Sequence, residues 1–413
     1  MFRSLTRIVV CVLTLVGASA TPALAQRIVL STSDFASGST DLIDLTSGAT
    51  THLGDFASSE MWLTATGEFL LRYEGTWRVR HIATGLEVAL PPAFVPLFVH
   101  PRETVVYGDM SGTLTRLDPA GLHDLGVPCA TGGASGMDMA PATADLFVQC
   151  TSGEVVVVDA PTGTVRRRFA IGTTGRVHDI VALEGGTAFL VLEATGLTSE
   201  LRRVDAATGA TLATGAWPPF ASGVEPFLVP YPARDRVLAA YCVSVRVSVD
   251  CGLHPMDVST LTPGGTLPFS AGLTRQRNTV APDGAWLVVS PQRYSALVHL
   301  PDGAVAGATP FSVGVVRVAT GGWPPLPPLL TLASVTSRGV MLTWSLPVGS
   351  GAATTYRLEA GFAPGATAVS IDLGAAASTT IPGVPPGRYY ARIRAVNFNG
   401  VSAPSNEIVI DVP

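Results

Sequence analysis

The sequence predicts an all-β protein, a seven-bladed β-propeller followed by a β-sandwich, and three observations lead to this fold class. First, a polar turn that closes on glycine recurs seven times, at spacings of mostly about 36–46 residues, the repeat length of propeller blades. Second, pairs of strand-like runs separated by proline or another turn residue repeat between those turns. Third, the periodicity of amphipathic helices is almost absent.

The seven turns share one plan, in which a short apolar or alternating stretch runs into polar residues and then glycine. Glycine adopts the positive φ that tight turns require, so each copy predicts a hairpin between the two outer strands of a blade. The copies are LIDLTSG at 42–48, VRHIATG at 79–85, TRLDPAG at 115–121, VVDAPTG at 157–163, RRVDAATG at 202–209, HPMDVSTLTPGG at 254–265 and VHLPDG at 298–303.

The inner two strands of each blade are predicted by a looser motif that occurs only six times and is clearest in NTVAPDGAWLVVS at 278–290. One blade therefore lacks its innermost strand. The first unit starts directly with the strand-like run at 26–34, and an unassigned run, SVGVVRVAT at 312–320, follows the seventh turn. We expect the last strand to complete the first blade, which closes a propeller over residues 26–320 without an open sheet edge. Six blades are the alternative, if the long unit near 225–270 is miscounted.

Residues 1–25 have the three-part layout of a secretory signal peptide. Arg3 and Arg7 precede a short apolar run, and the small-residue cleavage site ALA follows at 23–25. No later stretch reaches the ~18 apolar residues that a membrane-spanning helix needs. The sequence thus predicts a secreted or periplasmic protein that does not insert into a membrane. Its formal net charge of −5 argues against nucleic acid as a partner.

Four cysteines lie beyond the predicted leader, and none shows the CxxC spacing of a zinc or redox site. We expect no metal or other cofactor. The blade register places Cys129 and Cys150 at one rim of the propeller, and Cys242 and Cys251 across a hairpin at the same rim. The prediction is two disulfides, Cys129–Cys150 and Cys242–Cys251; four buried free thiols are the alternative.

APDGAWLVVS at 281–290 and the turns VDAPTG and VDAATG resemble the repeat of the YVTN-type, lactonase-like β-propeller family, over residues ~27–320. The resemblance implies the fold. Such families include enzymes and pure binding proteins, so it implies no single activity.

A Pro-rich linker, GGWPPLPP at 321–328, precedes a second module at 329–413. Three segments of it, VMLTWSLP at 340–347, YRLEAG at 356–361 and the stretch 381–410, resemble strands B, C and E–F corner to G of a fibronectin type III domain. This resemblance implies core positions for Trp344, for Val384 before the corner, and for Tyr389 as the corner tyrosine.

The axial funnel is where a propeller concentrates chemistry, and it is lined by the first residues of the inner strands. These positions hold Glu60, Asp138, His178, Asp179, Glu225 and Asn278. Acids and one histidine could act as metal ligands, as hydrogen-bonding groups for a sugar or, in the case of His178, as a general base. The alternative is that they satisfy backbone groups and solvate a water-filled channel.

The favoured function is that of an exported, non-catalytic binding or scaffold protein, which engages a protein or a polysaccharide through propeller loops. Two alternatives stay open. One is a lactonase- or lyase-like enzyme with its site in the axial funnel, and the other is a structural component of a surface layer. The sequence does not indicate an oligomeric state.

Cleavage after Ala25 should leave a mature protein that begins at Gln26. N-terminal sequencing of the protein purified from its native host tests this directly. A chain with Met1 intact, recovered from the cytoplasmic fraction, would contradict both the leader and the export route.

Overall fold

A computed structural model describes most of the chain, namely residues 27–33, 38–44, 50–56, 61–140, 143–171, 176–183, 185–195, 198–216, 227–231, 234–245, 248–262, 264, 278–280, 286–289, 294–299, 305–310, 315–320, 324–336, 339–347, 350, 353–397 and 400–413. Every regular element within these residues is a β-strand. None of the residues described forms a helix long and apolar enough to cross a membrane. The chain divides into two compact units, Met1–His100 with Thr104–Gly321, and Pro101–Glu103 with Gly322–Pro413.

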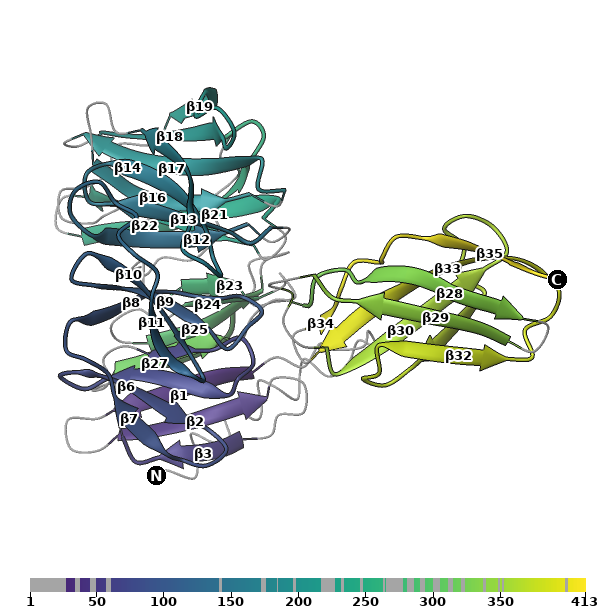
Figure 1. Cartoon of the computed structure of the whole chain (residues 1–413). Coiled ribbons are helices and arrows are strands. Elements are labelled where there is room, and N and C mark those ends of the chain that lie inside the picture. Colours follow the sequence, from purple (N-terminus) through teal and green to yellow (C-terminus); the bar gives the residue numbers. More distant parts are fainter. Residues whose placement is uncertain are drawn as a thin grey trace. The chain divides into compact units, whose positions relative to one another are not determined.

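The described strands of the first unit form seven small antiparallel sheets, numbered here in chain order (Figure 1). Sheet 1 contains β27 (Val315–Thr320), β1 (Arg27–Ser33), β2 (Gly38–Asp44) and β3 (Thr50–Gly54). Sheet 2 contains β4 (Met61–Leu63), β5 (Phe69–Tyr73), β6 (Trp77–His81) and β7 (Glu87–Ala89). Sheet 3 contains β8 (Phe94–Val99), β9 (Val106–Met110), β10 (Thr113–Asp118) and β11 (Gly121–Asp124).

The remaining four sheets repeat this plan. Sheet 4 contains β12 (Ala134–Met139), β13 (Asp145–Cys150), β14 (Glu154–Asp159) and β15 (Val165–Ala170). Sheet 5 contains β16 (Arg176–Ala182), β17 (Ala188–Thr195), β18 (Thr198–Asp205) and β19 (Thr211–Ala216). Sheet 6 contains β20 (Phe227–Pro230), β21 (Arg236–Val245) and β22 (Ser248–Asp257). Sheet 7 contains β23 (Asn278–Val280), β24 (Trp286–Val289), β25 (Tyr294–His299) and β26 (Val305–Pro310).

Sheet 1 joins the two ends of the first unit, as the sequence predicted. Strand β27 pairs with β1 in antiparallel register from Ile28 opposite Thr320 to Ser33 opposite Val315. Figure 1 accordingly draws the green β27 against the purple β1. The first strands of sheets 3 to 7 contact one another in chain order, and β27 contacts both β25 of sheet 7 and β4 of sheet 2. The series of sheets therefore closes on itself through β27.

The recurring turn has one backbone geometry in sheets 2, 4, 5 and 6. In each, the amide of the fifth residue donates to the carbonyl of the first, for example from Gly163 to Asp159 and from Gly209 to Asp205 (2.8 and 2.9 Å). In sheets 4, 5 and 6 the first residue is an aspartate, and its side chain accepts from the fourth residue, as Asp205 does from the Thr208 amide and hydroxyl. These hydrogen bonds lower the pKa of Asp205. In sheet 2 this position holds His81. The polar groups of the turn are thus hydrogen-bonded to one another within the turn itself. The copies at 42–48 and 298–303 fall partly outside the described residues.

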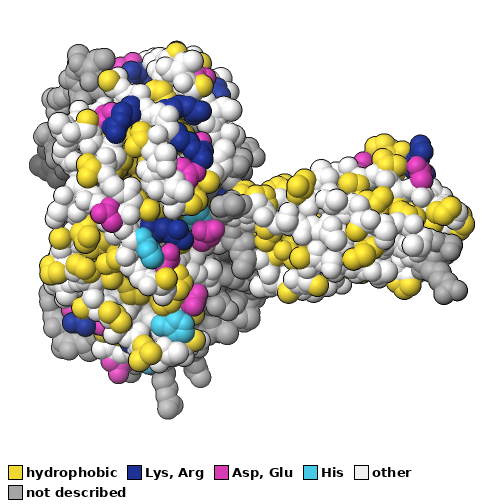
Figure 2. Space-filling model, in the orientation of Figure 1, with side chains coloured by type: hydrophobic (Ala, Val, Ile, Leu, Met, Phe, Trp, Pro, Cys, Tyr) yellow, Lys and Arg dark blue, Asp and Glu magenta, His cyan; other side chains and the backbone are white. Residues whose placement is uncertain are grey.

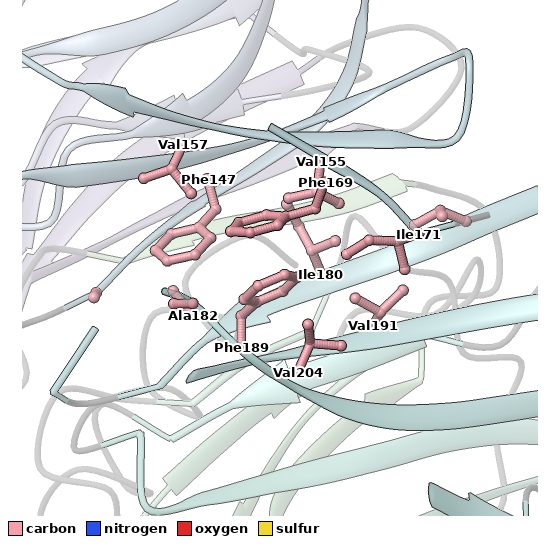
Figure 3. Packing of buried hydrophobic residues seen from close by; sticks show 13 residues of the cluster. Phe147, Val155, Val157, Phe169, Ile171, Ile180, Ala182, Phe189, Val191 and Val204 are labelled. Atoms are coloured by element: carbon pink, nitrogen blue, oxygen red, sulfur yellow. The ribbon is translucent and has the colours of Figure 1, made fainter. Parts of the chain in front are cut away.

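The core of the first unit consists of apolar layers between neighbouring sheets. Figure 3 shows the layer between sheets 4 and 5, where Phe147 and Val157 face Phe189 and Val191. The ring centroids of Phe147 and Phe189 are 5.2 Å apart. Strand β14 buries both of its faces, with Val155 and Val157 in the layer toward sheet 5 and Val156 and Val158 in the layer toward sheet 3, which explains why this strand is apolar without alternation.

The second unit consists of two antiparallel sheets around one core. One contains β28 (Leu329–Thr336), β29 (Gly339–Ser345) and β32 (Ser378–Pro382). The other contains β30 (Thr355–Gly361), β31 (Val369–Asp372), β33 (Gly387–Asn397), β34 (Gly400–Val401) and β35 (Ile408–Val412). Leu342 and Trp344 from the first sheet pack with Tyr356, Leu358 and Ile393 from the second.

The structure places the three residues singled out in this module at or beside its core. Trp344 is 5% exposed, and its ring lies 5.4 Å from that of Tyr356. Val384 and Tyr389 are partly buried against the same core. The Tyr389 hydroxyl donates to the carbonyl oxygen of Pro385, four residues earlier, at 2.9 Å.

Replacing Gly163 with alanine should destabilise the first unit more than replacing Gly75. The two glycines have nearly the same φ, 71° and 70°, so alanine incurs roughly 1–2 kcal/mol of backbone strain at either position. A Cβ at Gly163 would also lie 2.3 Å from the Leu125 carbonyl oxygen, whereas one at Gly75 would meet nothing within 4 Å. Urea unfolding of both variants measures the difference; equal losses would contradict the close approach.

Trp344→Ala should reduce the unfolding free energy of the second unit by ~3–5 kcal/mol, because it empties a buried volume between the two sheets. Met341→Ala is the matched control, since Met341 lies on the same strand and is 39% exposed. Hydrogen exchange of the second unit's amides in the full chain reports both. Similar losses for the two variants would show that Trp344 does not fill the core.

Candidate functional site

The candidate funnel residues are only partly described. Asp138 and Asp179 lie on β12 and β16 and are buried, at 5% and 6% exposure. His178 on β16 and Asn278 at the start of β23 have described backbones, whereas their side chains lie outside the described residues. Glu60 and Glu225, which precede β4 and β20, also lie outside them.

Asp138 does not lie where the sequence placed it. It is the penultimate residue of β12 rather than the first, because the strand begins earlier, at Ala134, with a register shift between Ala134 and Gly136. The expected position at the start of an inner strand is therefore wrong for this residue.

Asp138 accepts hydrogen bonds from two other sheets. The Arg234 guanidinium, in the turn between β20 and β21 of sheet 6, donates to both carboxylate oxygens, at 2.7 Å for Oδ1. The Ala182 amide at the end of β16 donates to Oδ2 at 2.8 Å. Side chains of the ion pair are 5% and 8% exposed. A buried carboxylate with a bidentate arginine and a backbone donor is compensated in charge and in hydrogen bonding, so it joins sheets 4, 5 and 6.

Arg234 has an unusual backbone conformation. Its φ is +58°, a region that L-residues other than glycine rarely adopt. The corresponding turns of sheets 2 and 5 use the same i to i+3 hydrogen bond, with Gly67 and Gly186 in this position. Here arginine replaces glycine, which indicates that the salt bridge to Asp138 outweighs the backbone strain.

Asp179 forms a second tie of the same kind. Its Oδ1 accepts from the Ile180 amide and its Oδ2 from the Leu228 amide of β20, both at 2.9 Å. The same arrangement thus occurs between sheets 4 and 5 and between sheets 5 and 6. In both, an aspartate on the first strand of one sheet accepts a hydrogen bond from a backbone amide on the first strand of the next sheet. Both described acids satisfy backbone amides, and their burial contradicts the expectation that they solvate a water-filled channel.

Glu193 is a buried acid that the sequence analysis missed. It lies on β17, is 7% exposed, and accepts from Arg202 of β18 at 2.5 Å. Burial raises its pKa, and Arg202 opposes that shift. Glu193 follows five buried apolar residues of the same strand. The strand therefore shows no alternation of apolar and polar residues that would have marked Glu193 as buried.

A loop at one rim of the first unit is held by a covalent bond. Residues 125–133, which we call the braced loop, connect β11 to β12. The predicted disulfide Cys129–Cys150 is present and links this loop to the end of β13. The Ala130 amide donates to Glu154, and the Gly133 carbonyl accepts from Thr151 at 3.0 Å. Val127 nevertheless remains 63% exposed, so the loop presents an apolar side chain from a fixed backbone.

Among the described residues on the face drawn in Figure 2, arginine side chains of the first unit lie beside acidic ones. The basic run at 166–168 follows this pattern. Arg166 pairs with Asp145 and Asp159, and Arg168 pairs with Glu154. Among the described residues, no group of three or more His, Cys, Asp or Glu side chains is suited to hold a metal ion.

No protein-family model and no curated protein matches the chain. Among solved structures it is similar to a candidate 6-phosphogluconolactonase from Bacteroides fragilis, with TM-score 0.48, 12% identity, and coverage of 73% of this chain and 99% of that one. For a chain of the mitotic checkpoint complex the TM-score is 0.45 and the identity 14%, with 63% of this chain and 81% of that one covered. For hydrazine synthase of Kuenenia stuttgartiensis the TM-score is 0.47 and the identity 10%, with 70% of this chain and 95% of that one covered. At these values the likenesses carry no argument about activity.

Removing one partner of the Asp138–Arg234 pair should cost about 3–5 kcal/mol, because the other charge stays buried. Asp138→Asn, Arg234→Gly and the double variant form a cycle, in which the double variant should lose less than the sum of the single losses. Asp235→Asn is the control, since the Asp235 side chain is 54% exposed. Additive losses in urea unfolding would contradict the tie.

The raised pKa of Glu193 predicts a stability that falls as pH rises. Well below the ordinary pKa of 4.5, the Glu193 carboxyl is protonated in both the folded and the unfolded chain, and its contribution to the unfolding free energy is fully present. As pH rises from there through the folded-state pKa, the unfolded chain loses its proton first, and that contribution is lost. Glu193→Gln, which can still accept from Arg202, should flatten the profile in a pH series of urea unfolding. An unchanged profile would contradict the burial effect.

Proposed function

We propose that the seven sheets are the blades of a seven-bladed propeller and that the second unit is a fibronectin type III domain. The pairing of β27 with β1 supports the first assignment, because it supplies the missing inner strand of the first blade. The tyrosine-corner hydrogen bond of Tyr389 and the buried Trp344 support the second. The domain limits follow as 26–320 and 329–413, with 321–328 as linker.

We propose further that this is an exported, non-catalytic binding or scaffold protein whose partner is a protein or a polysaccharide. The observation that carries this proposal is the engagement of Asp138 and Asp179. Both buried acids are hydrogen-bonded to backbone amides of the next sheet, and Asp138 also to Arg234. A carboxylate used in this way holds sheets together, whereas a general base needs a free lone pair at a site open to substrate. The disulfide agrees with export to an oxidising compartment.

The braced loop is the part of the first unit best suited to contact a partner. Loops positioned by a rigid scaffold are where binding residues concentrate, and a loop that is already held in place loses little entropy on binding. Val127 is an exposed apolar side chain of this loop.

Binding to polysaccharide and protein fractions from the host surface tests the function, with immobilised fractions and the purified full chain. Val127→Asp should weaken binding by about tenfold or more, as for the loss of an apolar anchor. Val88→Asp is the matched control, since Val88 is 67% exposed on the outer strand β7. Equal behaviour of the two variants would exclude the braced loop as the contact.

A parallel assay addresses the enzyme alternative. The purified protein should release no acid from a panel of lactones above the buffer background. Turnover that disappears in His178→Ala would overturn the non-catalytic function and favour a site in the axial funnel.

A further inference from the structure

The β21–β22 hairpin is longer than the rest of its sheet. Its strands pair over their full lengths, from Arg236 opposite Asp257 to Val245 opposite Ser248. Strand β20 pairs only with the segment Val237–Ala240. Among the described residues, no third strand pairs with the distal half of the hairpin, residues 241–245 and 248–252. A two-stranded hairpin is only marginally stable by itself in water, so a covalent bond across this half would add to its stability.

The backbone register places Cys242 directly opposite Cys251 in that distal half. Directly opposed residues of antiparallel strands have Cα atoms about 4.5–5.5 Å apart. This separation falls within the range of about 4.4–6.8 Å that a disulfide requires. A register slip of one residue would place the two cysteines out of opposition, so the pairing depends on the register that the whole hairpin shows.

The cysteine count points to the same pair. The chain has five cysteines, of which Cys11 lies in the predicted leader. Cys129 and Cys150 are bonded to each other. Cys242 and Cys251 are therefore the two that remain for each other in the mature chain.

We propose that Cys242 and Cys251 form a cross-strand disulfide that stabilises the distal half of the β21–β22 hairpin. This inference rests on the proposed export of the protein. In the exporting compartment the two thiols lose two protons and two electrons, and a protein disulfide of a thiol–disulfide oxidoreductase accepts them and becomes a dithiol. Cys150 ends the second strand of sheet 4, and Cys242 lies in the second strand of sheet 6 beyond its pairing with β20. Both bonds therefore secure hairpins at the rim that carries the braced loop.

Tryptic mapping without reduction tests the bond on the full chain from its native host, denatured and alkylated beforehand. The chain has no lysine, and Arg246 is the only arginine between Arg236 and Arg275. Peptides 237–246 and 247–275 thus carry one of the two cysteines each, and they should appear as one linked species that separates on reduction. Cys129 and Cys150 share the peptide 117–166, which serves as the internal control.

The outcomes separate the bond from the export on which it rests. One outcome is that peptides 237–246 and 247–275 are separate and alkylated, whereas peptide 117–166 keeps its internal disulfide. This outcome would overturn the hairpin disulfide and leave the export proposal standing. Linkage of either peptide to 117–166 would overturn the pairing. Alkylation of all four cysteines would overturn the disulfide and the export proposal together.

A second measurement tests the stabilising effect in the native protein. Trypsin should cut at Arg246, between the two cysteines, about tenfold or more faster when both are replaced by serine, because local opening then becomes easier. The double replacement of Cys129 and Cys150 by serine is the control and should leave cleavage at Arg246 unchanged. An unchanged rate in the Cys242→Ser/Cys251→Ser variant would overturn the proposed role of the bond.

Discussion

The antiparallel pairing of β27 with β1 is the constraint on which the first unit depends. Its sheets bury apolar residues against the sheets before and after them. Such a series has two exposed ends unless it closes. Strand β27 completes sheet 1 and contacts sheets 7 and 2, so both ends are covered and the first strand gains a partner.

Buried charges hold the inner strands together within this closed series. Asp138 and Asp179 accept hydrogen bonds from backbone amides of the following sheets, and the Arg234 guanidinium compensates the charge of Asp138. The positive φ of Arg234, where related turns carry glycine, shows that this arrangement persists against local backbone preference. Groups of this kind fix the relative position of sheets that apolar layers alone would allow to slide.

The rim of the first unit differs from its interior in how it is held. Inside, apolar layers and buried ion pairs determine the packing, whereas the braced loop is secured by the Cys129–Cys150 bond and by hydrogen bonds to neighbouring hairpins. A fixed loop with an exposed apolar residue is a surface suited to binding, and the second unit adds a separate β-sandwich to the same chain. These are the features on which the proposed binding function rests.

Local patterns in the sequence were sufficient for the hairpins around the described turns, the partner of the last strand and the Cys129–Cys150 bond. Each follows from the spacing of glycine, proline and apolar residues over short stretches, or from the sheet register that this spacing implies. The roles of the candidate acids were decided only by packing. Asp138 and Arg234 are 96 residues apart and meet across sheet 5, and no local pattern distinguishes a carboxylate that faces solvent from one that faces a buried guanidinium. Glu193 was missed for the same reason, because a strand buried on both faces has no alternation that marks an inward acid.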